Sequence, residues 1–272
     1  MDGFLLPILK NPTFHESVAN GMIQVAVLTF VILYFMIDAP YGKFSDSSKK
    51  SLISGIMGPS IPARLAWFIF ESPNLIWSVI CLSTRNEQIF RAPNAILLFI
   101  FVAHYINRAV VYPFCIINRE SKPMPLFVVA LATTFCLFNG YLQAQGLCQF
   151  QSYPEGYVQS FRFLGGICLC FAGMAINQQA DSILRNLRKP GEKGYVIPHG
   201  GAFTYVSSAH YFGEIVEWLG YAIAVNHISG FAFFIYTVSN LAPRAVSSHR
   251  WYQEKFGDKF PKNRKAVIPF LW

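Results

Sequence analysis

The chain has 272 residues, of which 53% are hydrophobic and only 13% are charged, and its formal net charge is +8. Soluble domains of this size carry about 25% charged residues, so the composition excludes an ordinary soluble protein and predicts a polytopic membrane protein. The excess positive charge is expected to orient helices and to contact anionic headgroups, and no soluble basic domain is present for nucleic-acid binding.

Seven apolar stretches follow one another, and each is predicted to be a membrane-spanning helix. They cover residues 20–37, 61–82, 94–112, 124–145, 161–187, 208–225 and 229–241. Residues 1–18 contain Pro7 and Pro12 and are expected to lie at the membrane interface, before a single domain over residues 19–272. Pro73 removes a backbone donor and is expected to kink the second helix near Glu71. The predicted fold class is therefore an all-α bundle of seven transmembrane helices.

The distribution of Lys and Arg predicts the orientation of this bundle. With the N-terminus outside, the inner loops and the C-terminal tail hold sixteen basic residues, and the outer side holds four, namely Lys10, Arg85, Arg91 and Arg162. Positive charge gathers on the cytoplasmic side of membrane proteins, so an outer or lumenal N-terminus and a cytosolic C-terminus are expected.

Several common site motifs are missing from the sequence. The six cysteines form no CxxC pair and are expected to be buried thiols, and no HExxH or clustered His/Cys set indicates a metal. There is also no GxGxxG after a strand and no Walker A loop. Any nucleotide is therefore expected to bind within the helical bundle.

Two groups in the second and third helices are candidates for chemistry. Glu71 lies between the apolar segments WFIF and SPNLIW, where a charged carboxylate is costly, so it is expected to be neutral and able to donate a hydrogen bond. The alternative is a glutamate bonded to backbone that Pro73 leaves exposed. Tyr105, Arg108 and Tyr112 share a helical face, and a mid-helix arginine needs a carboxylate or phosphate partner.

Polar residues on the last three predicted helices indicate a nucleotide site. Asn177, Asp181, Arg185 and Arg188 occupy successive turns, where an amide and a carboxylate could bind a ribose or nicotinamide and arginines could bind phosphates. A surface ion pair and a positive-inside anchor are the alternatives. On the next helix, the i,i+4 neighbours are His210, Glu214 and Trp218. The residues where the last helix leaves the membrane could anchor it or close a phosphate site from the inner side, and they are Arg244, His249, Arg250 and Tyr252.

Ordered motifs from residue 39 to the C-terminus resemble the steroid 5α-reductases, the 3-oxo-5α-steroid 4-dehydrogenases. They are APYGK, PARLAWFIFESP, HYINRAVVYP, NGYLQA, GMAIN with ILRNLRKPGE, GYVIPHGG, YFGEIVEWLGYA, PRA with SHRWY, and RKAVIPF. Each motif is short, but together and in this order they are specific.

The resemblance implies a monomeric, multi-pass enzyme of the endoplasmic reticulum membrane, or of the inner membrane in a bacterium. It would use NADPH to reduce the Δ4 double bond of a 3-oxo steroid. Glu71 and Tyr105 match the catalytic pair that polarises the 3-oxo group, and Trp67 and Phe135 match residues lining the steroid pocket. The matching cofactor positions, mainly within residues 112–272, are Tyr112, Asn118, Asn177, Asp181, Arg188, Tyr195, Glu214, Trp218, Arg244 and Tyr252.

Some positions depart from the family pattern, and other functions stay open. Phe70 replaces a glutamine of the vertebrate enzymes, His210 stands where many members have Asn, and Ser248-His249 replaces a His-His pair as in plant members. The alternatives are a related enoyl-thioester or polyprenol reductase, a membrane methyltransferase using S-adenosylmethionine, and a non-enzymatic sterol-binding membrane protein. A transporter would be expected to show discontinuous helices in paired halves, and none is predicted.

Overall fold

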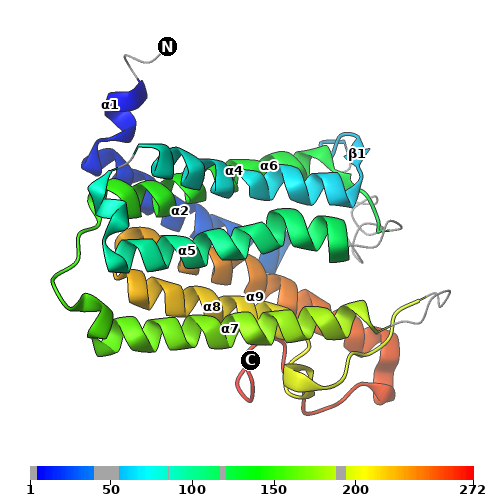
Figure 1. The fold of residues 1–272 in the computed structure, drawn as a ribbon. Helices are drawn as coiled ribbons and strands as arrows, with labels where there is room; N and C mark the ends of the chain where they lie inside the picture. Colours follow the sequence, from blue (N-terminus) through cyan, green and yellow to red (C-terminus); the bar gives the residue numbers. More distant parts are fainter. Residues whose placement is uncertain (1–4, 40–54, 85, 117–120, 188–193) are drawn as a thin grey trace. The chain divides into compact units, whose positions relative to one another are not determined.

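The computed structural model describes residues 5–39, 55–84, 86–116, 121–187 and 194–272, and most of them lie in helices (Figure 1). The described chain forms two compact units. Unit 1 takes its residues from the ranges 1–21, 39–160 and 227–229, and unit 2 from the ranges 22–38, 161–226 and 230–272. Helix α2 (Pro12–Val31) contributes residues to both units.

Unit 1 is built on three long helices. They are α4 (Ala63–Ser83), α5 (Ala92–Ile106) and α6 (Leu126–Gly140). Helices α5 and α6 run directly into the π-helices η4 (Asn107–Ile116) and η5 (Tyr141–Phe150). The short elements are α1 (Leu5–Leu9), β1 (Ser60–Ile61), the 3₁₀-helix η3 (Glu87–Phe90), β2 (Met124–Pro125) and the 3₁₀-helix η6 (Tyr157–Gln159). Strands β1 and β2 pair antiparallel, with Ser60 opposite Pro125 and Ile61 opposite Met124.

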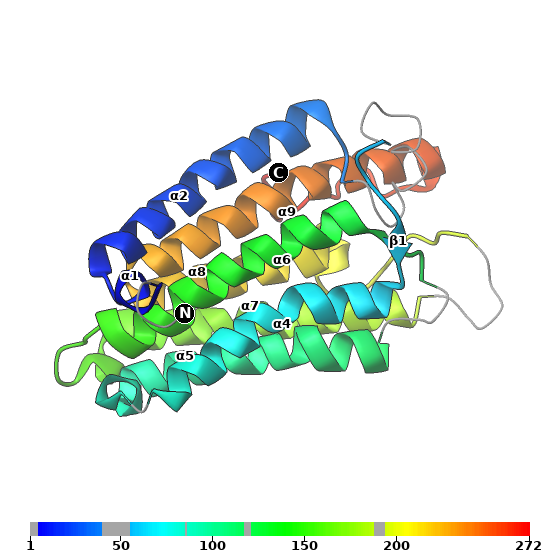
Figure 2. The same cartoon turned by 90° about the horizontal axis from the view of Figure 1, so that it is seen from above.

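Helix α4 buries one face. Helix α6 lies beside it, as the two views in Figure 1 and Figure 2 show. The buried positions recur every three or four residues from Ala63 to Cys81, as expected for an α-helix with one packed side. Gly140 makes the closest approach, because a Cβ there would lie 2.9 Å from Asn74 Cα and 3.0 Å from the Pro73 carbonyl oxygen. Only glycine therefore allows α6 to pack against α4 beside Pro73.

Unit 2 contains three more long helices. They are α7 (Phe161–Arg185), α8 (Ala209–Val225) and α9 (Ile228–Phe256), which joins unit 2 from Gly230. The unit also holds the end of α2 with the π-helix η1 (Ile32–Met36), and the 3₁₀-helices η7 (Gly201–Thr204) and η8 (Gly257–Lys259).

Helices α7 and α8 run side by side with backbones in contact (Figure 1). The buried positions of α7 alternate in steps of three and four from Phe163 to Ala180, which is the period of a helix pressed against one neighbour. A Cβ at Gly173 would clash with the backbone nitrogen of Glu217, and one at Gly166 would lie 2.7 Å from that of Ala224. Small residues at the interface are how membrane helices approach closely.

The C-terminal segment docks against the strand-like connection before α8. Ser207 N donates to Lys265 O at 2.8 Å, and Lys265 N donates to Tyr205 O at 2.9 Å. The chain then turns back, with Val267 N donating to Trp272 O at 2.9 Å. These bonds fix the basic tail to unit 2.

Five described helices are long and apolar enough to cross a membrane. They are Pro12–Met36, Ala63–Ser83, Ala92–Cys115, Leu126–Phe150 and Phe161–Arg185, and they correspond to the first five predicted spans. Large apolar side chains project from them into the surroundings, including Leu28, Phe35 and Phe99 at 58%, 73% and 70% exposure. Such exposed apolar faces are expected where a helix meets lipid. The predicted all-α, multi-pass membrane character is thus supported.

Two helix boundaries differ from the prediction, and a third helix runs through a proline that was expected to kink it. Helix α2 begins at Pro12, not at residue 20, because the Asn11 side chain caps it by accepting from Thr13 N at 2.9 Å, and proline is suited to a first helical turn. Helix α4 continues through Pro73 without interruption. Helix α9 extends beyond residue 241 to Phe256, so the first part of the predicted tail is helical.

Candidate active site

Three helices of unit 1 bring the predicted catalytic pair into one polar environment. Glu71 on α4 and Tyr105 on α5 are 8% and 3% exposed. From α6, the Cys136 thiol donates to Glu71 Oε2 at 3.7 Å, and Asn139 Nδ2 donates to the Tyr105 phenol oxygen at 3.1 Å. A buried carboxyl group and a buried phenol are suited to donating hydrogen bonds to a ligand carbonyl.

Next to this pair, Arg108 lies against two aromatic rings. Its guanidinium carbon is 4.8 Å from the centroid of Trp67 and 5.1 Å from that of Tyr112, and the two rings are 4.8 Å apart. Arg108 thus makes cation–π contacts with two aromatic rings of unit 1. Phe135, the other predicted pocket residue, lies on α6 and is half-buried.

The predicted cofactor residues of α7 and α8 include one that joins the two helices. Asn177 Nδ2 donates to the backbone oxygen of His210 at 2.8 Å, which joins α7 to the start of α8. Asp181 follows one turn later and is half-buried, as are His210 and Glu214. Trp218 is 1% exposed, and its ring lies 4.2 Å from Phe233.

Helix α9 supplies a second group of predicted residues. Arg244 Nη1 donates to Asn240 Oδ1 at 3.0 Å, and its Nη2 donates to the Tyr211 hydroxyl at 2.8 Å. Further along α9, the ring of Trp251 packs edge-on against that of Tyr195, with their centroids 4.7 Å apart. The two hydrogen bonds of Arg244 hold its guanidinium group between α8 and the preceding turn of α9.

His249 and Tyr252 belong to a cluster formed with the C-terminal segment. His249 Nδ1 is 2.6 Å from Ser207 Oγ, and Nε2 is 2.9 Å from Gln253 Nε2. Burial lowers the pKa of His249, and the nearby positive charges of Arg264 and Lys265 lower it further. The imidazole is therefore favoured in its neutral form.

Arg264 is a candidate that the sequence reasoning missed. It is only 4% exposed, and its guanidinium lies 5.5 Å from the ring centroid of Phe260, which stacks with Tyr252. Its Nε and Nη1 atoms have no hydrogen-bond partner among the described residues. Because a buried cation is costly without an anion, this site is suited to an anionic ligand. In the sequence, Arg264 counted only as one of many basic tail residues.

The amides Asn74, Asn139 and Gln143 were also missed. All three are buried: Asn139 contacts Tyr105, and Asn74 and Gln143 contact Asn139. A polar amide inside an apolar span was the sequence signal that could have identified them. Asn118 and Arg188, both predicted to bind the cofactor, lie outside the described residues.

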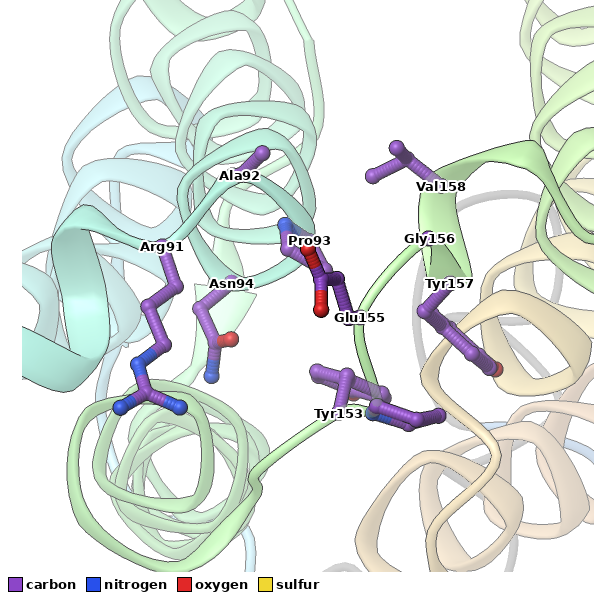
Figure 3. A pocket seen from close by; sticks show the side chains of 10 residues that line it. Arg91, Ala92, Pro93, Asn94, Tyr153, Glu155, Gly156, Tyr157 and Val158 are labelled. Carbon is purple, nitrogen blue, oxygen red and sulfur yellow. The ribbon is translucent and has the colours of Figure 1, made fainter.

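A separate pocket of about 300 Å³ opens at the start of α5 (Figure 3). Residues 91–94 and 153–158 line it, and Tyr153 and Tyr157 stack there with centroids 4.5 Å apart. None of the predicted site residues is among its lining residues.

Comparison with known proteins gives matches along most of the chain. The family model described as 3-oxo-5-alpha-steroid 4-dehydrogenase matches residues 122–272. The "3-oxo-5-alpha-steroid 4-dehydrogenase 1" of Bos taurus is 44% identical over 94% of this chain and 96% of its own length. The protein of that name from Mus musculus is 46% identical over 91% of this chain and 92% of its own. The "Steroid 5-alpha-reductase DET2" of Gossypium hirsutum is 40% identical over 91% and 93%.

Proposed function

Because the chain belongs to the 3-oxo-5-alpha-steroid 4-dehydrogenase family, we propose that it reduces the Δ4 double bond of a 3-oxo steroid to the 5α product, with NADPH as the reductant. The observation that carries this proposal is the 44% identity to the bovine relative over 94% of the chain. The buried Glu71 and Tyr105 support it from the chemistry of the residues.

Conjugate reduction of an enone needs an acid at the carbonyl oxygen, because negative charge develops there as the β-carbon receives a hydride. Tyr105 and a neutral Glu71 donate hydrogen bonds to the 3-oxo oxygen and stabilise the enolate. Burial strengthens both bonds, since water does not compete for the donors. Trp67 and Phe135 provide the apolar walls expected for a steroid.

NADPH supplies a hydride when bound, and the residues of unit 2 have the chemistry to hold it. Guanidinium groups bind phosphates, and Arg264 offers buried N–H groups with no hydrogen-bond partner among the described residues, which fits an anionic group. The other proposed contacts in unit 2 are Asn177, Asp181, Tyr195, His210, Glu214, Trp218, Arg244, His249 and Tyr252. Tyr112, Asn118 and Arg188 complete the proposed set.

The proposed membrane arrangement has seven spans, with α8 and the first half of α9 as the sixth and seventh. The N-terminus is outside or lumenal and the C-terminus is cytosolic, in the endoplasmic reticulum membrane or a bacterial inner membrane. The excess of basic residues on the proposed inner side supports this arrangement.

The direct test is an activity assay on membranes that contain the protein. The membranes are incubated with NADPH and a panel of 3-oxo-Δ4 steroids, and 5α-reduced products are identified by mass spectrometry. Enoyl thioesters and polyprenols belong in the same panel. Reduction of an enoyl thioester or polyprenol without any reduced steroid would contradict the proposal.

The assigned acids give the first prediction. We expect Glu71→Gln and Tyr105→Phe each to lower turnover by at least about 100-fold, because each loses a proton donor at the developing enolate. NADPH binding, measured by fluorescence on the purified protein, is expected to stay close to wild type, because neither residue is assigned to the cofactor. Near-normal turnover in both variants would contradict the assignment.

A further inference from the structure

Asn139 is a fully buried amide on α6 that connects to both neighbouring helices of unit 1. Its Nδ2 donates to the Tyr105 phenol oxygen at 3.1 Å and to Asn74 Oδ1 at 3.2 Å, so both amide protons are in use. The next residue is Gly140, where α6 approaches α4 too closely for a side chain. Asn139 is therefore held at a fixed place beside the proposed catalytic tyrosine.

The orientation of this amide decides what Tyr105 can do, because amide nitrogen and oxygen have similar shapes and opposite hydrogen-bonding roles. Gln143, one turn further along, fixes the orientation from one side. Its Nε2 donates to the backbone oxygen of Ser229 at 2.9 Å, and a carbonyl oxygen can only accept. The same nitrogen lies 3.3 Å from Asn139, so the Asn139 atom facing it is the oxygen.

Asn74 fixes the same orientation from the other side. Its Nδ2 donates to the backbone oxygen of Glu71 at 3.4 Å, again a group that only accepts. The oxygen of Asn74 then faces Asn139, and the Asn139 atom opposite it has to be the donating nitrogen. Two backbone carbonyls on different segments therefore require the Asn139 nitrogen to face Asn74 and Tyr105.

This polarity has a consequence for the phenol. Its oxygen accepts a hydrogen bond from Asn139, so the phenol proton takes no part in that bond and is donated to a different acceptor. When Tyr105 donates its proton toward a carbonyl, negative charge grows on the phenol oxygen. The hydrogen bond that the phenol oxygen accepts from Asn139 Nδ2 then becomes stronger.

We propose that Asn139 is a positioning residue that directs the Tyr105 proton toward the carbonyl of the substrate. This inference rests on the function proposed above. It adds that the acid strength and direction of Tyr105 are set by an amide chain anchored on two backbone carbonyls.

A double-mutant cycle tests the inference. Asn139→Ala is expected to lower kcat by roughly 10- to 100-fold with little change in KM, because a hydrogen bond that strengthens in the transition state is lost. In a Tyr105→Phe background, which lacks the phenol oxygen, the same substitution is expected to cause little further loss. An equal loss in both backgrounds would show a purely structural role and overturn the inference.

Asn139→Asp provides a second, isosteric variant in case the alanine variant does not fold. When it is ionised, a carboxyl group at this place accepts a hydrogen bond from the Tyr105 hydroxyl, which reverses the direction of the bond. We expect its kcat to fall as well, and to recover partly at low pH, where a protonated carboxyl group can donate again. A pH profile parallel to that of the wild type would count against the role of Asn139.

Asn94→Ala is the matched control. Asn94 is equally buried in unit 1, but it donates to the backbone oxygens of Leu147 and Gln151 at 2.7 and 2.8 Å. Its substitution is expected to cause the same fractional change in both backgrounds, because it reports only the cost of losing a buried amide. A wild type with no reductase activity would overturn the proposed function together with this inference, whereas an active wild type with additive Asn139 effects would overturn the inference alone.

Discussion

Two basic residues of the C-terminal segment, two positions apart, are in opposite environments. The Lys262 side chain is 83% exposed, and its amine lies 3.8 Å from the fully exposed Asp258 carboxylate. Arg264 is buried, stacks on Phe260, and has two nitrogen atoms without a hydrogen-bond partner among the described residues. An exposed ion pair contributes little to stability, whereas a buried guanidinium binds an anion strongly.

The second of these residues gives a prediction for cofactor binding. Arg264→Gln is expected to raise the KM for NADPH by about tenfold or more, because a charge-assisted hydrogen bond to phosphate is worth roughly 1.5–3 kcal/mol. Lys262→Gln is the control and is expected to leave KM unchanged. The measurement is initial rate against NADPH concentration at fixed steroid. A KM change of the same size in both variants would point to general loss of positive charge and contradict a specific role for Arg264.

For single residues, the sequence predicts which polar side chains are buried in the helices better than it predicts which residues they contact. The buried positions of Glu71 and Tyr105 could be predicted, because ionisable and hydroxyl groups in apolar spans stand out. Their catalytic role stays a prediction. The Tyr112 ring beside Arg108 could also be expected, because the two share a helical face, but the Trp67 ring could not, since its contact depends on how α4 and η4 pack. Burial of Arg264 likewise follows from the docking of the tail, which the sequence does not reveal.

The α7–α8 pair carries five of the proposed cofactor residues, namely Asn177, Asp181, His210, Glu214 and Trp218. Gly166, Gly173, Gly213 and Gly220 bring the two backbones together, and a Cβ at any of them would come within 3 Å of backbone atoms on the opposite helix. That approach allows Asn177 to reach the carbonyl of His210. The register of the two helices therefore positions the residues proposed to contact NADPH.

A single methyl group tests this packing. Gly173→Ala is expected to destabilise the protein by about 1–3 kcal/mol, because an added Cβ would strike the backbone of Glu217 and force the helices apart. Gly165→Ala on the same helix is the control, since its Cβ would meet nothing within 4 Å, and helix propensity predicts a neutral or slightly stabilising effect. Thermal unfolding in detergent measures both. Equal unfolding temperatures in the two variants would contradict tight packing at Gly173.

Helix existence was predictable here, but helix ends were not. Hydropathy locates the first five spans, because each must carry enough apolar residues to cross lipid. The start of α2 depends on the Asn11 cap, a single hydrogen-bonding side chain that a hydropathy average does not detect. The π-helices that extend α5 and α6 also leave no periodic signal of their own.

For the whole molecule, the proposed topology depends on α8 and α9. With 17 residues, α8 is about 26 Å long at 1.5 Å per residue, close to the hydrocarbon thickness of roughly 30 Å. Helix α9 is long enough, but its second half carries Arg244, Arg250 and Lys255, so only its first half is suited to lipid. If α8 and the first half of α9 each cross the membrane, sixteen basic residues lie on its inner side and four on its outer side.

Glycosylation mapping tests this topology, because the native chain has no usable N-x-S/T acceptor: Asn11-Pro12-Thr13 is blocked by proline. A flexible insert that carries an acceptor is placed after the exposed Glu155, on the proposed outer side, or after Trp272, on the proposed cytosolic side. Glycosylation occurs in the lumen, so in microsomes we expect a mass shift only for the first protein. Modification of the C-terminal insert would contradict the orientation. A third insert, placed before Met1, tests the number of spans. An even number would place both termini on one side of the membrane, so the N-terminal and C-terminal inserts would both be glycosylated or both remain unmodified.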